Sequence, residues 1–213
     1  MDPQSGSEVT DMGATFGLVD RLLWDSPVGW AYAKVVPRSH AGVYADVAEV
    51  LALSADDDLL DIGCGPGAFL AEHAQRARTV TGLDPSRTML REAQKRLSER
   101  ISAGTGRLVL AGSEHLPFDD GAFSAVTVIT APADLAEVHR VLRPRGRLVV
   151  VDELAADPRK PASQRTAGGL WPYDEADTIR LLKQAGFSDP TVRYRGVWHI
   201  VDNRIISCTR TGP

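Results

Sequence analysis

The chain has 213 residues, of which 43% are hydrophobic and 24% charged, and this composition predicts one ordinary globular domain with a single core. Its formal net charge of −4, from 28 acidic and 24 basic residues, provides no attraction to a nucleic-acid backbone or an anionic membrane surface. The two cysteines, Cys64 and Cys208, follow no repeated spacing, which argues against a disulfide framework or a zinc site and favours a reducing, cytoplasmic setting.

The amino-terminal region is predicted to contain a loose arm followed by helices. Residues 1–15 are polar and acidic, lack the basic-then-apolar order of a secretory signal, and are interpreted as a flexible arm. Residues 16–55 are predicted to form a helical cover over the domain. The apolar positions that share one helical face are Val43, Val47, Val50 and Leu51. No apolar stretch reaches the about 20 residues needed to span a bilayer.

Residues 58–153 alternate between strand and helix patterns. Strands are predicted at residues 59–62, 79–84, 107–112, 122–130 and 146–153. Helices are predicted at residues 68–77, 85–100 and 133–142. Such alternation, with strands that are apolar throughout ("VTVIT", "LVVV"), is typical of βαβ units on a parallel sheet covered on both faces.

Residues 154–213 are predicted to complete the sheet with a helix and a pair of strands. The helix covers residues 174–187, and Gly186 is positioned as its C-cap glycine. The two strands, at residues 191–194 and 203–210, have no helix between them, so an antiparallel pair is expected.

A glycine-rich turn, "DIGCGPGAFL", connects the first of these strands to a helix. Gly63, Gly65 and Gly67 carry no Cβ, so the backbone adopts unusual angles and a ligand approaches the main chain closely. The turn also satisfies the loose dinucleotide fingerprint. Asp61 argues against that ligand, because a carboxylate at this strand end repels a pyrophosphate and suits a cation with an ammonium and a sulfonium.

Four stretches between residues 58 and 153 occur in a specific order. They are "LLDIGCGPG", "VTGLDPSRTML", "LAGSEHLPFDDGAFSAVTVI" and "LAEVHRVLRPRGRLVVVDE". In this order they resemble the glycine motif, the second strand with its terminal acid, the adenine-binding turn with the fourth strand, and the fifth strand of class I S-adenosylmethionine-dependent methyltransferases. The subgroup that they resemble most is the small-molecule methyltransferases that include the quinone C-methylating enzymes.

The resemblance implies a set of residues that hold S-adenosylmethionine. Gly63, Gly65 and Gly67 would contact its methionyl part, and Asp61 its ammonium group. Asp84 would bind both ribose hydroxyls and also cap the helix that begins near Pro85. The adenine would pack against Pro85, and the methionyl side would be lined by Thr130.

At the adenine-binding turn the sequence departs from the family pattern. The family often has an acid at the adenine turn, where this chain has Gly112 and Ser113. Recognition of the adenine amino group is therefore assigned to the main chain of this turn, to Glu114 or to water. No metal is expected at the site.

The sequence specifies the methyl acceptor and a catalytic base less closely than it specifies the cofactor site. The base candidates are His40, His115 and His199, which lie at element ends or in loops. The candidates for an apolar acceptor pocket are Trp24, Trp30, Tyr32, Trp171 and Tyr173, which all lie outside residues 58–152. The same aromatic residues also suit a purely structural role, fastening the flanking segments to the core.

These features together predict a single α/β domain over residues 16–213. Its expected fold is Rossmann-like and doubly wound, with a mostly parallel seven-stranded sheet that ends in an antiparallel pair. The expected function is methyl transfer from S-adenosylmethionine to a small, apolar or aromatic metabolite by in-line displacement, without nucleic-acid or membrane partners. The alternatives are an NAD(P)-dependent oxidoreductase and a non-catalytic S-adenosylmethionine-binding protein.

Overall fold

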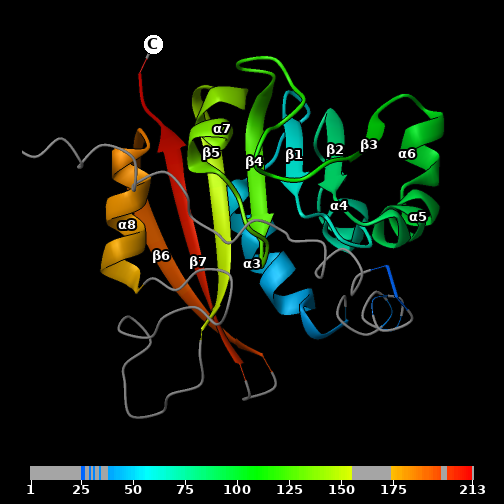
Figure 1. The fold of residues 1–213 in the computed structure, drawn as a ribbon, viewed down its shortest axis with the longest axis horizontal. Coiled ribbons are helices and arrows are strands. Elements are labelled where there is room, and N and C mark those ends of the chain that lie inside the picture. Colours follow the sequence, from blue (N-terminus) through cyan, green and yellow to red (C-terminus); the bar gives the residue numbers. More distant parts are fainter. Residues whose placement is uncertain are drawn as a thin grey trace, which may run out of the picture.

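The fold is built on one twisted seven-stranded sheet (Figure 1). The computed structural model describes residues 25, 26, 29, 31, 34, 38–154, 174–197 and 201–212. The strands are β1 (Asp58–Ile62), β2 (Thr79–Asp84), β3 (Gly106–Leu110), β4 (Phe123–Ile129), β5 (Leu142–Leu154), β6 (Phe187–Val197) and β7 (Val201–Arg210). The helices are α3 (Ala41–Leu51), α4 (Ala68–Glu72), α5 (Arg87–Arg96), α6 (Ser98–Ser102), α7 (Leu135–Val141) and α8 (Glu175–Gln184).

The strand order is β3-β2-β1-β4-β5-β7-β6, which confirms the predicted fold class. The first five strands pair in parallel, and β7 pairs antiparallel with both β5 and β6. The chain moves outward from β1 to β3 and then returns to place β4 on the other side of β1, so a topological switch point lies between β1 and β4. Ligands bind at such a point, beyond the carboxyl ends of the strands.

Two apolar layers cover the sheet, one on each face. Alternate residues of a strand point to opposite faces, so Leu59 packs with α3 and α4 while Leu60 packs with α7 and α8. Val43, Val47 and Leu51 of α3 are fully buried, as the helical pattern predicted. Burying each such side chain stabilises the fold by about 1.5–3 kcal/mol, so the two layers fix the sheet between its helices.

Side-chain caps fix where three helices begin. Asp134 and Asp174 cap α7 and α8, and Ser86 caps α5 by accepting a hydrogen bond from the Met89 amide (3.2 Å). The prediction that Asp84 caps this helix is therefore wrong: α5 begins two residues later than expected, and Ser86 occupies the capping position. Gly186 follows α8 with φ +90°, as expected of a C-cap glycine.

Two predicted helices are shorter in the structure. The stretch 85–100 is divided at Leu97, which is fully buried and ends α5 before the short helix α6 begins. The stretch 68–77 remains helical only to Glu72, and the side chain of Arg100 donates to the carbonyls of Ala74 and Ala77 instead. Buried tertiary contacts thus override the local helical pattern at both places.

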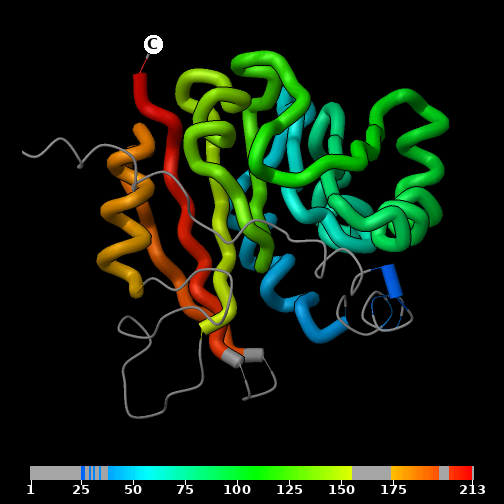
Figure 2. Tube along the Cα trace, in the orientation of Figure 1, coloured from blue at the N-terminus to red at the C-terminus, as the bar shows by residue number. Residues whose placement is uncertain are grey.

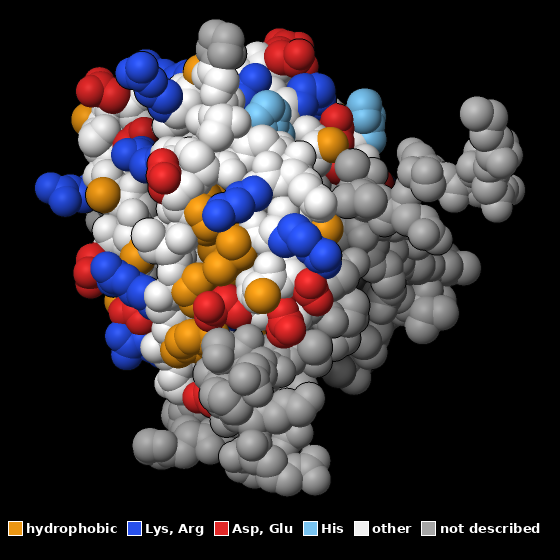
Figure 3. Space-filling model, turned by 90° about the vertical axis from the view of Figure 1, so that its left-hand side faces the viewer, with side chains coloured by type: hydrophobic (Ala, Val, Ile, Leu, Met, Phe, Trp, Pro, Cys, Tyr) orange, Lys and Arg blue, Asp and Glu red, His pale blue; other side chains and the backbone are white. Residues whose placement is uncertain are grey.

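The two ends of the sheet and its outer side at β6 differ in the chain segments and side chains found there. In Figure 2 the chain leaves β7 at the top, at the opposite end of the sheet from the carboxyl ends of the parallel strands, because β7 is antiparallel to β5. On the side formed by α8 and β6, charged side chains of both signs surround a short apolar stretch (Figure 3). Charge on an edge strand disfavours pairing with another chain.

Among the described residues, no helix is long and apolar enough to cross a membrane. The predicted arm, residues 1–15, lies outside the described residues.

Candidate functional site

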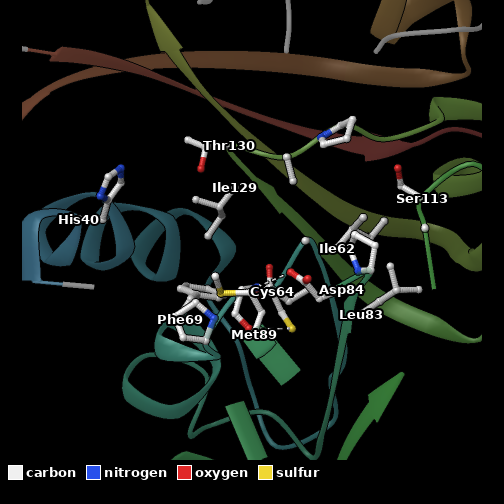
Figure 4. Close-up of a pocket in the computed structure, with 18 of the residues that line it drawn as sticks. His40, Ile62, Cys64, Phe69, Leu83, Asp84, Met89, Ser113, Ile129 and Thr130 are labelled. Atoms are coloured by element: carbon white, nitrogen blue, oxygen red, sulfur yellow. Dashed lines mark hydrogen bonds between the residues drawn. The ribbon is translucent and has the colours of Figure 1, made fainter. Parts of the chain in front are cut away.

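A pocket lies at the switch point, and it is lined by most of the predicted site residues that the structure describes. It encloses about 900 Å³ of space, open solvent included. The predicted residues on its walls are His40, Asp61, Gly63, Gly65, Asp84, Pro85, Gly112, Ser113 and Thr130. In Figure 4, His40 and Ser113 lie at opposite ends of the pocket, with Asp84 and Cys64 between them. The carboxyl ends of β1, β2 and β4 therefore meet at one cavity, as their order along the chain predicted.

Two glycines of the turn after β1 are required by its geometry. Gly63 has φ +70°, and a Cβ there would lie 2.3 Å from the Cβ of Ala131, so only glycine allows the turn to contact the segment after β4. Gly65 has φ +52° with no atom within 4 Å of the place a Cβ would take, and it faces the pocket. A ligand thus has access to bare backbone at Gly65.

Gly67 does not line the pocket; it is a packing residue. Its φ is +73°, and a Cβ there would lie 2.9 Å from the Cβ of Ala93 on α5. The missing side chain lets the start of α4 approach α5. The third glycine of the motif therefore shapes the turn from behind.

Asp61 is a buried carboxylate at the end of β1. Its exposed fraction is 2%, and Thr127 of β4 donates a hydrogen bond from Oγ1 to Asp61 Oδ1 (2.7 Å). Burial disfavours the charged form and raises the pKa of Asp61 to about 7, and the neighbouring Asp84 carboxylate adds to the rise. Asp61 forms no ion pair with the described residues.

Asp84 joins the glycine turn to the start of α5. Its Oδ2 accepts from the Gly65 amide (2.9 Å) and its Oδ1 accepts from the Ser86 amide (2.8 Å). Burial nonetheless raises its pKa to about 6. An ionised carboxylate offers about four lone-pair sites, so two acceptor positions are left for a ligand. Asp84 likewise has no cationic partner among the described residues.

The turn after β3 places the Glu114 carboxylate close to the pocket, but this side chain does not line the pocket. Gly112 and Ser113 line the pocket, whereas Glu114 does not. The Glu114 side chain folds back over Gly112, since a Cβ on Gly112 would lie 2.1 Å from Glu114 Oε2. Glycine at position 112 therefore makes room for the Glu114 carboxylate.

The three histidines predicted as candidate bases lie in different places relative to the pocket. His40 lines the pocket, and its Nε2 lies 3.2 Å from Oε1 of Glu153, at the carboxyl end of β5. His115 is exposed and lies beside Glu137, outside the pocket lining. His199 lies outside the described residues. Only His40 is brought to the cavity among the candidates that the structure describes.

The predicted pocket aromatics, Trp24, Trp30, Tyr32, Trp171 and Tyr173, all lie outside the described residues. Among the described residues, two other aromatic side chains line the pocket. They are Tyr44 and Phe69, with ring centroids 5.9 Å apart, and the ring of His40 lies 6.1 Å from Tyr44. Tyr44 follows His40 by four positions, so it shares a helical face with it, a signal that the sequence contained.

The remaining walls are mostly apolar. Cys64, Met89 and Ile129 complete the lining near Asp84, and burial raises the pKa of the Cys64 thiol well above its usual range. A buried, protonated thiol is unreactive. No group of three or more His, Cys, Asp or Glu side chains in the described part of the chain is arranged to hold a metal ion.

A family model and several relatives that are named methyltransferases match this chain. A family model described as a methyltransferase domain matches residues 59–146. The uncharacterized methyltransferase YodH of Bacillus subtilis is 31% identical over 174 residues, which is 76% of this chain and 68% of that protein. The O-methyltransferase cnsE of Penicillium expansum is 29% identical over 197 residues, or 86% and 69%. Among solved structures, magnesium protoporphyrin IX methyltransferase of Synechocystis with bound SAM has a TM-score of 0.67 at 19% identity, covering 97% of this chain and 100% of that one.

Proposed function

This chain belongs to the class I S-adenosylmethionine-dependent methyltransferases, and from this premise we propose which residues hold the cofactor and what the enzyme methylates. When bound, S-adenosylmethionine supplies an activated methyl group on a sulfonium sulfur. The observation that carries the proposal is the pair of buried carboxylates, Asp61 and Asp84, on the wall of a pocket that contributes no cation from the described residues. A ligand with an ammonium and a sulfonium provides the missing positive charge.

The methionyl part of the cofactor is assigned to the turn after β1 and the end of β4. Gly63 and Gly65 offer bare backbone, Asp61 binds the ammonium group directly or through water, and Thr130 lines the same side. Gly67 supports this turn from the α5 side. Thr127 holds Asp61 in place through its hydrogen bond.

The adenosine part is assigned to the ends of β2 and β3. Asp84 accepts from both ribose hydroxyls with the lone pairs that the Gly65 and Ser86 amides leave free. Pro85 packs on the adenine, and the turn at Gly112 and Ser113 borders its edge. The Glu114 carboxylate, folded over Gly112, is proposed to accept a hydrogen bond from the adenine amino group.

The acceptor is proposed to be a small, apolar or aromatic molecule at the His40 end. Tyr44 and Phe69 provide flat apolar surface there. Methyl transfer is an in-line displacement, so the enzyme's main contribution is to hold the acceptor aligned, a contribution of up to about 7–11 kcal/mol. The fold relative from Synechocystis acts on magnesium protoporphyrin IX, which is consistent with an acceptor of this kind.

His40 is the proposed general base. Its Nε2 lies against the Glu153 carboxylate, which favours the tautomer with the proton on Nε2 and leaves Nδ1 as the basic nitrogen. In the structure the Ser39 hydroxyl lies 3.0 Å from Nδ1. A base of this kind contributes about 10²–10⁴-fold for an oxygen or an activated carbon acceptor.

A thermal-shift titration separates this function from that of an NAD(P)-dependent oxidoreductase. S-adenosylhomocysteine is expected to raise the melting temperature, while NADH is expected to leave it unchanged because its pyrophosphate would face Asp61. Stabilisation by NADH and not by S-adenosylhomocysteine would refute the proposal.

The substitution Asp84→Ala tests the ribose assignment. It is expected to weaken S-adenosylmethionine binding by about 1.5–3 kcal/mol, because hydrogen bonds to a charged acceptor are lost. Isothermal calorimetry measures this directly. The matched control is Asp119→Ala, which removes an exposed carboxylate outside the pocket and should leave the affinity unchanged. Equal affinity of Asp84→Ala and the unmodified enzyme would show that the assignment is wrong.

We further propose that the enzyme works in the cytoplasm as a single domain over residues 16–213, without nucleic-acid partners. Cys64 and Cys208 are both buried and form no disulfide, which suits a reducing compartment. The net charge of −4 supports a small-molecule partner over a polyanion.

A further inference from the structure

Thr130, directly after β4, has a backbone conformation that threonine rarely adopts. Its φ is +50°, in the left-handed region, where a β-branched side chain is strained. The other non-glycine residues with positive φ among those the structure describes are Ala52, Arg145 and Asp189, none of which lines the pocket. Strain of this kind persists where the surroundings enforce it, and it gathers at functional sites.

The backbone around Thr130 is held from two sides. Its amide donates to the carbonyl of Val151 on β5 (2.9 Å). The next residue, Ala131, lies so close to the glycine turn that a Cβ on Gly63 would be 2.3 Å from its own Cβ. The chain therefore cannot relax at position 130 without disturbing both β5 and the turn after β1.

The Thr130 hydroxyl is available for a ligand. Thr130 lines the pocket, and its hydroxyl makes no hydrogen bond to any described group. In Figure 4 it lies beyond Ile129 on the His40 side of the cavity, away from Ser113. The adenosine end assigned above is at Ser113, so this hydroxyl lies at the other end, where the methionyl part of the cofactor and the acceptor would meet.

The chemistry of that end limits what the hydroxyl can bind. The walls on the His40 side include Ile129 and the rings of Tyr44 and Phe69, which suit a flat apolar body. The described lining contains no lysine and no arginine. A phosphate or carboxylate group would find no lysine or arginine to pair with among these described walls, whereas a neutral oxygen needs only one hydrogen bond.

We infer that Thr130 is a positioning residue whose hydroxyl binds a neutral oxygen substituent of a planar aromatic acceptor, and that its strained backbone aims the hydroxyl at that oxygen. This inference rests on the proposed methyl transfer and specifies its substrate class. A merely structural threonine would instead be expected to pair its hydroxyl within the protein.

The strain is tested by stability measurements on matched pairs. Glycine relieves a left-handed position that alanine does not, so Thr130→Gly should melt about 2–4 °C above Thr130→Ala. The control is Ala52→Gly at the left-handed C-cap of α3, remote from the pocket, which should show a similar rise over the unmodified enzyme. A Thr130→Gly protein no more stable than Thr130→Ala would overturn the strain argument.

The hydroxyl is tested by binding, independently of turnover. The probes are 2-naphthol and 2-methylnaphthalene, planar molecules that differ by a hydroxyl for a methyl group, titrated by fluorescence into enzyme saturated with S-adenosylhomocysteine. The unmodified enzyme and Thr130→Ser should prefer 2-naphthol by about threefold to tenfold, the worth of one hydrogen bond. Thr130→Val, which keeps the branched shape and loses the hydroxyl, should bind both equally.

Two results would overturn the inference: a preference that survives in Thr130→Val, or an unmodified enzyme that binds neither naphthalene. Both leave the proposed function standing as long as S-adenosylhomocysteine itself binds in calorimetry. Failure of S-adenosylhomocysteine to bind would instead refute the proposed function, so the two failures are distinct.

Discussion

Carboxylates lie at both ends of β1, and the protein treats the two ends in opposite ways. At the amino end, Asp58 accepts hydrogen bonds from Arg78, Thr79 and Arg143, at 2.6 Å from Thr79 and 2.7 Å from Arg143. The hydrogen bond from Arg78 has the largest effect and holds the pKa of Asp58 far below its ordinary value, against the effect of burial.

The neighbouring Asp57, just before β1, likewise has its hydrogen-bonding partners within the protein. Burial opposes its ionisation, yet hydrogen bonds from Arg147 and Ser124 lower its pKa to about 2. At the carboxyl end, Asp61 of β1 and Asp84 at the end of the neighbouring strand β2 have no such cationic partners among the described residues, and burial raises their pKa values to about 7 and about 6. The fold neutralises its own charge at one end and leaves the other end to a cationic ligand.

The largest expected effect is at the amino end and concerns stability alone. Asp58→Ala should lower the free energy of unfolding by about 3 kcal/mol, because three donors lose their partner, although the two arginines are partly exposed and regain water. Denaturant titration measures the loss. Affinity for S-adenosylhomocysteine should not change.

The control for this prediction is the exposed neighbour Asp56. Asp56→Ala should change the free energy of unfolding by less than about 0.5 kcal/mol. A loss of cofactor affinity in Asp58→Ala comparable to its loss of stability would mean that the two ends of β1 are not independent.

The second expected effect is a pH dependence of opposite sign at the two ends. Asp57 has a lowered pKa in the folded state, so its stabilising contribution is present above about pH 4 and is lost as pH falls toward about 2. Asp61 and Asp84 have raised pKa values, so the folded state binds more protons than the unfolded one, and their contribution to stability falls as pH rises from about 4 to 7.

Cofactor binding should follow the carboxyl end. A cation binds the ionised carboxylates, so affinity for S-adenosylmethionine should rise on the order of tenfold from about pH 5.5 to pH 7.5. Asp61→Asn should remove most of this slope in calorimetry, and the exposed control Asp119→Asn should retain it. A flat profile for the unmodified enzyme would contradict the prediction.

The smallest expected effect isolates the one hydrogen bond that the Asp61 side chain receives from the described residues. Thr127→Val should raise the pKa of Asp61 further and weaken cofactor binding near pH 7 by about 1 kcal/mol, roughly fivefold. Thr81→Val, at another buried strand threonine whose side chain makes no hydrogen bond to the described residues, is the matched control. Equal affinities in the two variants would show that the Thr127 bond does not matter for the cofactor.

Sequence reasoning succeeded where a short segment decides the outcome. The alternation of strands and helices, the positive φ of Gly63 and Gly65, and the placement of Asp61 and Asp84 in one pocket were all predicted. Parallel strands bring their carboxyl ends to one edge of a sheet, so the end of each strand pattern locates its last side chain in space. The cap of α5 was missed because Asp84 and Ser86 are both good capping residues and only the helix start distinguishes them.

The sequence by itself determined the order of elements and the ligand-facing turn, because strand and helix periods and glycine geometry act over a few residues. The tertiary structure decided the rest. His40 meets Glu153 across 113 positions and Thr127 meets Asp61 across 66, contacts that arise only when α3 and β4 pack against the sheet. The left-handed conformation of Thr130 follows from the same packing, since β5 and the glycine turn together hold a residue whose own preference is for other angles.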